Sequence, residues 1–340
     1  MILSIRWVSL AALLLLALPF ALTALETPDG LAEKTRADFR RPSAIPFPDG
    51  NAFSQAKSTL GEMLFFDPLL SGSRARSCAS CHNPSLSWTD GLPRAIGEKQ
   101  LALRSPSLID VAFTEFLGWD GKFENLESVA FGPIANPANM NLREPELIAR
   151  LSAIPGYLDL FELAFGEREV TRRKIELALA TFERTIITGD SPFDRWIAGD
   201  RNAVGAAAKR GFQIFNGKAH CSACHSGPSF TDGSFHDIGT GKNGDVGRGR
   251  LFPTSTKLQY AFKTPTLRDV ARRAPYMHDG SVATLKDVIL LYEKGGIARP
   301  SRSELITPLS LTENEKTDLM AFLQTLNDFS ASAKVPTLPR

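Results

Sequence analysis

Two short motifs contain every cysteine of the chain. They read Cys78-Ala79-Ser80-Cys81-His82 and Cys221-Ser222-Ala223-Cys224-His225, and both have the pattern CxxCH. Two thiols at this spacing can add to the two vinyl groups of one haem, and the histidine that follows then lies under the iron as its proximal ligand. The sequence therefore predicts two covalently bound c-type haems. Cys78, Cys81 and His82 would hold the first, and Cys221, Cys224 and His225 the second.

Other uses of paired cysteines fit this spacing less well. A zinc site needs a second cysteine pair a short loop away, whereas Cys221 lies 143 residues after Cys78. A thioredoxin-like dithiol has no need of the histidine in both motifs. Four cysteines are also too few for a disulfide framework in 340 residues.

The composition is that of a soluble globular protein. Apolar residues make up 43% and charged residues 22%, which excludes disorder, collagen and multi-span membrane classes. The 39 basic residues nearly balance 37 acidic ones, so no overall field would draw the chain to nucleic acid. At about 150 residues per domain, the length predicts two domains behind any targeting segment.

The N-terminus has the pattern of an export signal. Arg6 precedes an apolar run from Trp7 to Leu25, which ends in small residues. This pattern predicts a signal peptide over residues 1–24 and a periplasmic location for the rest of the chain. An uncleaved membrane anchor is the alternative, since the run is just long enough to span a bilayer.

Similar residues flank the two cysteine motifs. A Gly-x-x-x-Phe stretch precedes each, and Thr-Asp-Gly follows each. This weak repeat predicts a mainly α fold, in which two cytochrome-c-like helical domains with long loops carry one haem each. We expect an N-terminal extension over 25–54, the first domain over 55–190, the second over 191–330 and a tail over 331–340. The boundary falls at a turn-rich stretch, residues 188–192, or just after it at Gly199-Asp200.

Three helices are predicted with particular clarity. Apolar residues recur at helical spacing between Ile175 and Phe182. Thr284 begins a second helix that should stop at the glycines after Lys294. Thr312 and Glu315 form a capping box ahead of a closing amphipathic helix. The segment 239–249, rich in glycine and aspartate, is predicted to be a loop with little packing.

The ligand on the far side of each iron decides its chemistry, because an open position favours reaction with a small oxidant. The three histidines outside the motifs, His220, His236 and His278, all lie in the second half of the chain. Met63 and Met140 have no clear claim to the first iron. We therefore expect the first haem to be five-coordinate and open.

The second haem has several candidate ligands. Tyr292 lies on the apolar face of the second predicted helix. From this pattern alone, a core tyrosine is favoured over an iron ligand, and Met277 and His278 are rival ligands. His236 is expected to bond a haem propionate or its own loop, and His220 to face solvent.

Several longer motifs resemble the bacterial di-haem cytochrome c peroxidase and MauG family. They are Thr264-Pro265-Thr266-Leu267-Arg268-Asp269-Val270, Pro275-Tyr276-Met277-His278-Asp279-Gly280, Trp119-Asp120-Gly121-Lys122 and Gly132-Pro133-Ile134-Ala135-Asn136-Pro137 with Met140. Together with the two CxxCH motifs, the likeness covers about residues 55–330. It implies an oxidoreductase that uses hydrogen peroxide.

Two positions resemble the MauG branch, which includes a relative from methanobactin biosynthesis. Ordinary di-haem peroxidases have a histidine about sixteen residues after the first motif, where this chain has Glu98. They also have a methionine fourteen residues after the histidine of the HDG motif. Here that position is Tyr292, the residue type that MauG uses, so the resemblance implies that Tyr292 is the sixth ligand of the second haem.

The resemblance implies a periplasmic enzyme that uses hydrogen peroxide to oxidise a tryptophan on a partner protein. The reaction would run through a high-valent two-haem intermediate and electron hopping between aromatic side chains, with Trp119 as the relay between the haems. The alternative is a di-haem peroxidase that draws electrons from a small redox protein. A two-haem electron carrier is a third reading, which an open first haem disfavours.

The expected peroxide pocket of the first haem departs from the family at one position. Pro133 matches the distal proline, but Asn139 stands where the family has a glutamate that handles the peroxide proton. An amide can orient peroxide but cannot shuttle its proton. Either Glu127 or Glu144 substitutes through water, or peroxide activation is slower here.

A second departure concerns calcium. The family often has a Ca²⁺ ion between the haems, held in part by an asparagine two residues before the proline that is Pro106 here. That position is Arg104. We expect its guanidinium to replace the charge of the ion, because a fixed cation disfavours Ca²⁺. If calcium does bind, the carbonyl groups of Arg273 and Pro275 are its expected ligands.

Overall fold

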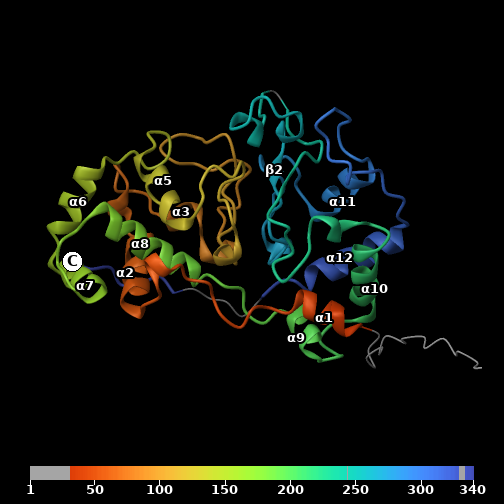
Figure 1. The fold of residues 1–340 in the computed structure, drawn as a ribbon, viewed down its shortest axis with the longest axis horizontal. Coiled ribbons are helices and arrows are strands. Elements are labelled where there is room, and N and C mark those ends of the chain that lie inside the picture. The colour runs from red at the N-terminus through yellow and green to blue at the C-terminus, as the bar shows by residue number, and fades with distance from the viewer. Residues whose placement is uncertain (1–30, 243, 329–333) are drawn as a thin grey trace, which may run out of the picture.

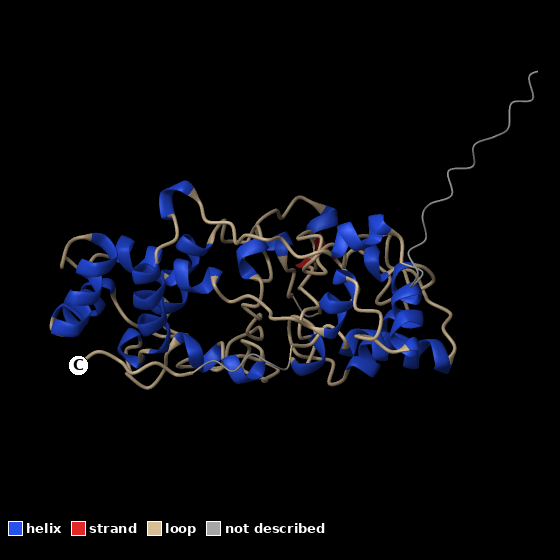
Figure 2. Cartoon of the chain, turned by 90° about the horizontal axis from the view of Figure 1, so that it is seen from below, coloured by secondary structure: helices blue, strands red, loops and turns tan. Residues whose placement is uncertain are grey.

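The structure is a computed structural model, which describes residues 31–242, 244–328 and 334–340. The expected signal peptide, residues 1–24, lies outside the described residues. Within the described ranges, no helix combines the length and the apolar character needed to cross a membrane. Figure 1 shows two helical groups side by side, and Figure 2 shows that loops and a short sheet occupy the region between them.

The fold is mainly helical, as predicted. The helices are α1 (Glu33–Phe39), α2 (Gln55–Phe66), α3 (Cys78–Cys81), α4 (Leu126–Val129), α5 (Phe131–Ala135), α6 (Glu144–Ser152), α7 (Pro155–Phe165), α8 (Arg172–Arg184), α9 (Pro192–Ala198), α10 (Ala206–Asn216), α11 (Leu285–Glu293) and α12 (Glu313–Gln324). Two-residue strands, β1 (Phe235–His236) and β2 (Phe262–Lys263), pair in antiparallel fashion. Short 3₁₀ helices join these elements, among them η4 (Val111–Phe113) and η5 (Cys221–Ala223).

Each helical group is built around one close helix crossing. Gly61 of α2 meets α8 so closely that an added Cβ would lie 2.0 Å from the carbonyl oxygen of Ala178. Gly211 of α10 meets α12 in the same way, 1.9 Å from the carbonyl oxygen of Asp318. Only glycine permits such an approach of two backbones. The repeated crossing confirms the prediction of two cytochrome-c-like domains.

The three predicted helices are present as α8, α11 and α12. The side chain of Thr284 accepts a hydrogen bond from the backbone of Asp287, and Thr312 forms the predicted capping box with Glu315. The prediction of little packing in 239–249 is wrong at the two ends of the segment. An added Cβ on Gly239 would lie 2.2 Å from the amide nitrogen of Ile297, and one on Gly247 would lie 2.3 Å from the carbonyl oxygen of Ala261. The backbone packs closely at both places, where composition gives no apolar signal, whereas Lys242 and Gly244 are exposed as predicted.

The two ends of the chain cross over between the domains. The ring of Phe39 in α1 lies 5.1 Å from that of Phe230, in the core of the second domain. Pro339, near the C-terminus, lies against Gly156 of α7 in the first domain. Figure 1 shows the C-terminus beside α7. The segment near the N-terminus therefore packs on the second domain, and the segment near the C-terminus packs on the first.

The internal repeat extends well beyond the cysteine motifs. Residues 105–111 (SPSLIDV) correspond to 264–270 (TPTLRDV), and the aspartate of each copy has a φ of 56°. Trp119-Asp120-Gly121 then corresponds to His278-Asp279-Gly280. The helix that follows starts at Leu126 in one copy and Leu285 in the other, behind equivalent caps. Seven residues later, the first domain has Pro133 and the second has Tyr292.

The two repeated loops face one another at the domain interface. The ring centroids of Trp119 and His278 are 6.5 Å apart. An added Cβ on Gly121 would lie 2.2 Å from the ring of Phe235 in the second domain, and one on Gly280 would lie 2.3 Å from Pro93 in the first. Each domain thus packs closely against the glycine in the loop of the other domain, and these contacts hold the two loops in place at the interface.

Candidate haem sites and the interface between them

The first cysteine motif forms α3 and the turn after it. The imidazole Nδ1 of His82 lies 3.3 Å from the carbonyl oxygen of Trp88. Burial lowers the pKa of His82, so the ring is neutral, as an iron ligand must be. A hydrogen bond at Nδ1 leaves Nε2 for the iron and orients the ring.

The second motif repeats this arrangement. The imidazole Nδ1 of His225 lies 2.9 Å from the carbonyl oxygen of Phe230, and burial lowers the pKa of His225. Trp88 and Phe230, which supply the two carbonyl groups, both have left-handed backbone angles, with φ of 60° and 52°. Burial raises the pKa of the Cys221 thiol to about 12.

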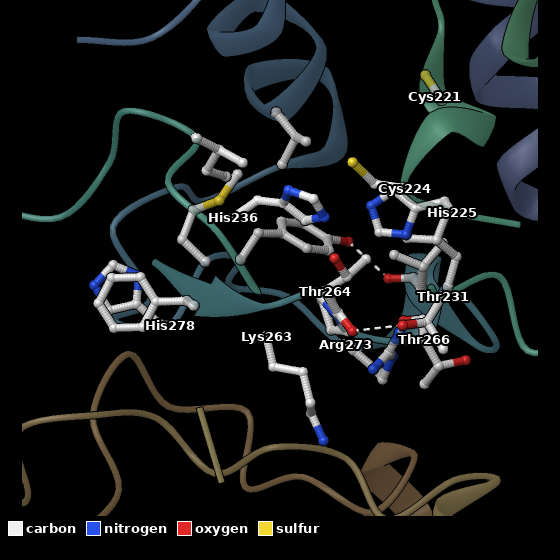
Figure 3. Close-up of a pocket in the computed structure, with 18 of the residues that line it drawn as sticks. Cys221, Cys224, His225, Thr231, His236, Lys263, Thr264, Thr266, Arg273 and His278 are labelled. Carbon is white, nitrogen blue, oxygen red and sulfur yellow. Dashed lines mark hydrogen bonds between the residues drawn. The ribbon is translucent and has the colours of Figure 1, made fainter. Parts of the chain in front are cut away.

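A largely apolar cavity opens beside the second motif. It is lined by Cys221, Cys224, His225 and residues of α11 and α12. Figure 3 shows the second motif at one side of this cavity, with His236 and Thr231 close to it. Tyr292 also lines the cavity, and burial raises the pKa of its phenol. The phenol is therefore neutral until a cation such as ferric iron favours the phenolate.

Two buried arginines test whether the cavity fits a haem. Arg104 and Arg273 both line it, each is 7% exposed, and the Nε atom of each has no hydrogen-bond partner among the described residues. Burial, with the neighbouring Arg104, lowers the pKa of Arg273 to about 10. Two cations this deep need anionic partners. The two propionates of a haem supply them, so the residues present fit the group.

The same residues do not fit calcium. The Nη2 of Arg104 donates a hydrogen bond to the carbonyl oxygen of Arg273, at 2.9 Å. That oxygen is one of the two ligands expected for the ion, and a guanidinium, which offers no oxygen, now occupies it. The backbone amide of Arg104 also donates to the carbonyl of His278, at 3.0 Å. Arg104 thus bridges the two domains at this point.

Each remaining histidine has a definite environment. His278 is 3% exposed, with its Nε2 3.1 Å from Asp245 and its ring stacked on Phe262 at 3.6 Å. The Nε2 of His236 lies 2.7 Å from Asp232, and the hydrogen bond raises the pKa of His236 to about 10. His236 therefore bonds its own loop, one of the two predicted outcomes. The other residues of the HDG motif serve the turn, where Asp279 accepts from the amide of Ser281, and His220 is exposed.

The distal segment of the first domain lies against the loop after the first motif. The amide of Glu98 donates to the carbonyl of Asn139 at 2.7 Å, and its exposed carboxylate accepts from the hydroxyl of Ser73 at 2.6 Å. Asn139 and Pro133 are half-buried, while Met140 is buried in the core. Met140 is therefore part of the packing.

The two carboxylates expected to handle the peroxide proton are already paired. Glu127 lies 2.7 Å from Arg184 and 2.9 Å from the amide nitrogen of Asn51. Although burial opposes it, these hydrogen bonds hold the pKa of Glu127 below its usual range. Glu144 is 41% exposed and pairs with Arg172 at 3.3 Å. These contacts give no support to either residue as the proton carrier.

Glu183, a buried residue, was not among the predicted site residues. Glu183 of α8 is 8% exposed, and its Oε2 has no hydrogen-bond partner among the described residues. Burial raises its pKa to about 8. The sequence does carry a signal for Glu183, because an acidic residue stands where the second copy of the repeat has leucine. The corresponding segments are Phe182-Glu183-Arg184-Thr185 and Phe322-Leu323-Gln324-Thr325.

Fold and sites together define a protein with two c-type cytochrome domains, each arranged to hold one haem. The family model for di-haem cytochrome c peroxidase matches residues 55–202, and that for cytochrome c matches residues 208–327. The chain belongs to the di-haem cytochrome c peroxidase and MauG family, whose members are oxidoreductases that use peroxide. It accordingly carries two covalent c-type haems.

Similar proteins come from both branches of the family. The chain is 49% identical to the methylamine utilization protein MauG of Methylorubrum extorquens, over 89% of this chain and 87% of that protein. It is 32% identical to the cytochrome c551 peroxidase of Pseudomonas aeruginosa, over 95% and 94%. Among solved structures, a MauG-like protein associated with microbial copper homeostasis has a TM-score of 0.82 at 31% identity, covering 87% of this chain and 97% of that one.

Proposed function

We propose that this protein uses hydrogen peroxide to oxidise a tryptophan on a partner protein. Its first haem, at His82, would be open to peroxide, and its second, at His225, would be closed by Tyr292. The greater identity to MauG than to the peroxidases supports this proposal. We further propose that the enzyme works in the periplasm, on the pattern of its N-terminal residues.

One observation carries the proposal. In the repeat, Pro133 and Tyr292 stand at equivalent positions, seven residues after the first residue of the helix that follows each loop. Proline has no atom that can ligate iron, whereas a tyrosine phenolate can. Tyr292 lines the cavity that also contains the cysteines and His225 of the second motif. This difference supports an open first iron and a second iron closed by Tyr292.

Trp119 is well placed to connect the two sites. Its indole Nε1 donates to the carbonyl of Arg104 at 3.0 Å, and its own carbonyl accepts from the amide of Lys263 in the second domain at 2.9 Å. Its ring lies 6.5 Å from that of His278. These contacts hold the indole at the domain interface, where an aromatic relay needs to be.

The chain's own residues perform the supporting work. His82 and His225 are held in one orientation by their carbonyl partners, and Arg104 and Arg273 offer cations to the propionates. When bound, the haems supply peroxide activation and storage of oxidising equivalents. In the first pocket, Asn139 can orient peroxide through its amide. A protein substrate would not reach the iron, so electrons must pass through side chains such as Trp119.

The proposal is tested with the holoprotein and a periplasmic extract from cells that lack its gene. Peroxide is added, and mass spectrometry measures oxygen addition or cross-linking at tryptophan. We expect modified tryptophan in one partner with the wild type and none with Tyr292→Met. Peroxide turnover that consumes reduced cytochrome c, with no tryptophan modified in the extract, would establish the peroxidase function instead.

A further inference from the structure

We propose that Glu183 is the proton-exchanging partner of the first haem: the buried carboxyl group takes up a proton when that haem is reduced and releases it when the haem is oxidised. The proposal depends on the first haem being bound at Cys78 and Cys81. It does not depend on the identity of the substrate, so it can fail or succeed independently of tryptophan oxidation.

The position of Glu183 follows from the repeat. The close crossings at Gly61 and Gly211 align Phe182 with Phe322, because the Cβ of each phenylalanine lies 2.8 Å from the added glycine Cβ. The next residue is then Glu183 in the first domain and Leu323 in the second.

The helix ends confirm this register. The hydroxyl of Thr185 donates to the carbonyl of Phe182 at 2.7 Å, and that of Thr325 donates to Phe322 at 2.6 Å. Leu323 lines the cavity beside Cys221 and His225. By the same geometry Glu183 belongs to the wall of the first haem site.

Contacts within the first domain agree with this placement. The ring of Phe182 lies 6.1 Å from that of Trp88, whose carbonyl oxygen accepts from His82. The charge of Glu183 also acts on the thiol of Cys78, which is a point of haem attachment. A buried carboxyl group thus acts on a cysteine that would attach the first haem, in the domain expected to react with peroxide, whereas the other domain has leucine.

The surroundings leave Glu183 poorly compensated. Burial is the main influence on its pKa, and Arg184 on its own helix opposes burial while Glu127 on α4 reinforces it. Arg184 is already paired with Glu127. On α2, Lys57 bonds Asn51 and the carbonyl of Ala52. The charge of Glu183 also acts on Cys78 of α3, which becomes a thioether in the holoprotein. Besides Lys57, α2 carries one ionisable side chain, Glu62, and η4 carries none.

Linkage then couples the group to the iron. Reduction of the ferric haem by one electron from an external donor removes one positive charge, which favours the protonated carboxyl group, and one proton enters from solvent. By reciprocity, ionised Glu183 favours the oxidised haem. In the pH range where Glu183 ionises, the equilibrium constant for reduction of the first haem should fall by up to tenfold for each unit that the pH rises.

The test is a spectroelectrochemical titration of both haems in the holoprotein between pH 6 and pH 10. We compare the wild type with E183Q, with E183L, which copies the second domain, and with the control E62Q. In the wild type and E62Q we expect the first haem to become harder to reduce as pH rises through about 8. Both Glu183 variants should lose this dependence, and the second haem should behave alike in all four proteins.

Thermal unfolding gives a second measurement. Because the pKa of Glu183 is raised from 4.5 to about 8 in the folded state, its contribution to stability is complete below about pH 4.5 and is lost as pH rises from there through about 8. E183Q should therefore gain melting temperature relative to the wild type over this range, and the gain should be complete above about pH 8. If E183L does not retain the first haem, the proposal is tested by E183Q alone. A first haem whose pH dependence is unchanged in E183Q would overturn the proposal.

Discussion

The two domains share one frame and differ at a few decisive positions. Both have the glycine crossing, the CxxCH turn, a carbonyl acceptor in left-handed conformation and a left-handed aspartate. On this frame, Pro133 is exchanged for Tyr292, Trp119 for His278 and Glu183 for Leu323. The shared scaffold can therefore hold a haem in either domain, and we expect the exchanged side chains to set what each haem can do.

The largest effect is expected where the domains differ in iron ligation. Tyr292→His should give the second haem an ordinary nitrogen ligand and lower peroxide-dependent tryptophan oxidation by at least about 100-fold, or about 2.7 kcal/mol in the barrier. The helix should remain, because position 292 is in the last turn of α11. Turnover is measured together with the optical spectrum. Unchanged turnover would contradict the ligand assignment.

The next effect concerns the relay. Trp119→Phe keeps an aromatic ring at the interface but removes the indole donor to Arg104. We expect tryptophan oxidation to slow by about tenfold or more, while the free energy of unfolding changes by only about 1 kcal/mol. Trp196→Phe, in the core of the second domain, is the matched control. An equal rate loss in both variants would show a packing effect.

The interface between the repeated loops can be broken directly. Gly280→Ala forces a φ of 66° on a side chain whose Cβ would lie 2.3 Å from Pro93, so we expect a loss of about 2–3 kcal/mol in unfolding free energy. Gly166→Ala, with a φ of 79° and open space around it, is the control and should cost about 1 kcal/mol. Denaturant unfolding measures both. Equal losses would mean that the contact with Pro93 is unimportant.

The next prediction concerns whether the guanidinium of Arg104 takes the place of a calcium ion. Because its guanidinium occupies the carbonyl of Arg273, the wild type should be indifferent to calcium chelators. Arg104→Asn frees that oxygen and adds another, and its stability should rise with added Ca²⁺. Thermal unfolding with and without Ca²⁺ measures the effect, with Arg104→Lys as the variant that keeps the charge. Stabilisation of the wild type by calcium would show that the guanidinium of Arg104 does not take the place of the ion.

The smallest expected effect is the pH dependence of a pair found only in the second domain. A hydrogen bond to Asp232, with a further contribution from Cys224, raises the pKa of His236 to about 10. The pair therefore contributes stability that is complete below about pH 6.5 and is lost as pH rises through about 10. His236→Gln should flatten the stability profile between these limits. A profile unchanged by this substitution would mean that the pair contributes nothing measurable.

The sequence predicts features that depend on local spacing. The cysteine motifs, the cap at Thr284 and the capping box at Thr312 each involve residues a few positions apart, so they are visible without the fold. The packing of 239–249 and the bond from Arg104 to Arg273 depend on distant segments meeting. The role of Glu183 is visible in the sequence only once the structure has aligned the two helix crossings. That alignment shows that its counterpart, Leu323, lines the cavity beside the second motif.

The central claim is that one iron is open and the other is closed by Tyr292. An electron paramagnetic resonance spectrum of the resting ferric holoprotein tests it most directly. We predict one high-spin haem and one low-spin haem with a tyrosine-type ligand, and the low-spin signal should change in Tyr292→His. Two low-spin haems at rest, with peroxide reactivity appearing only after one-electron reduction, would contradict the account.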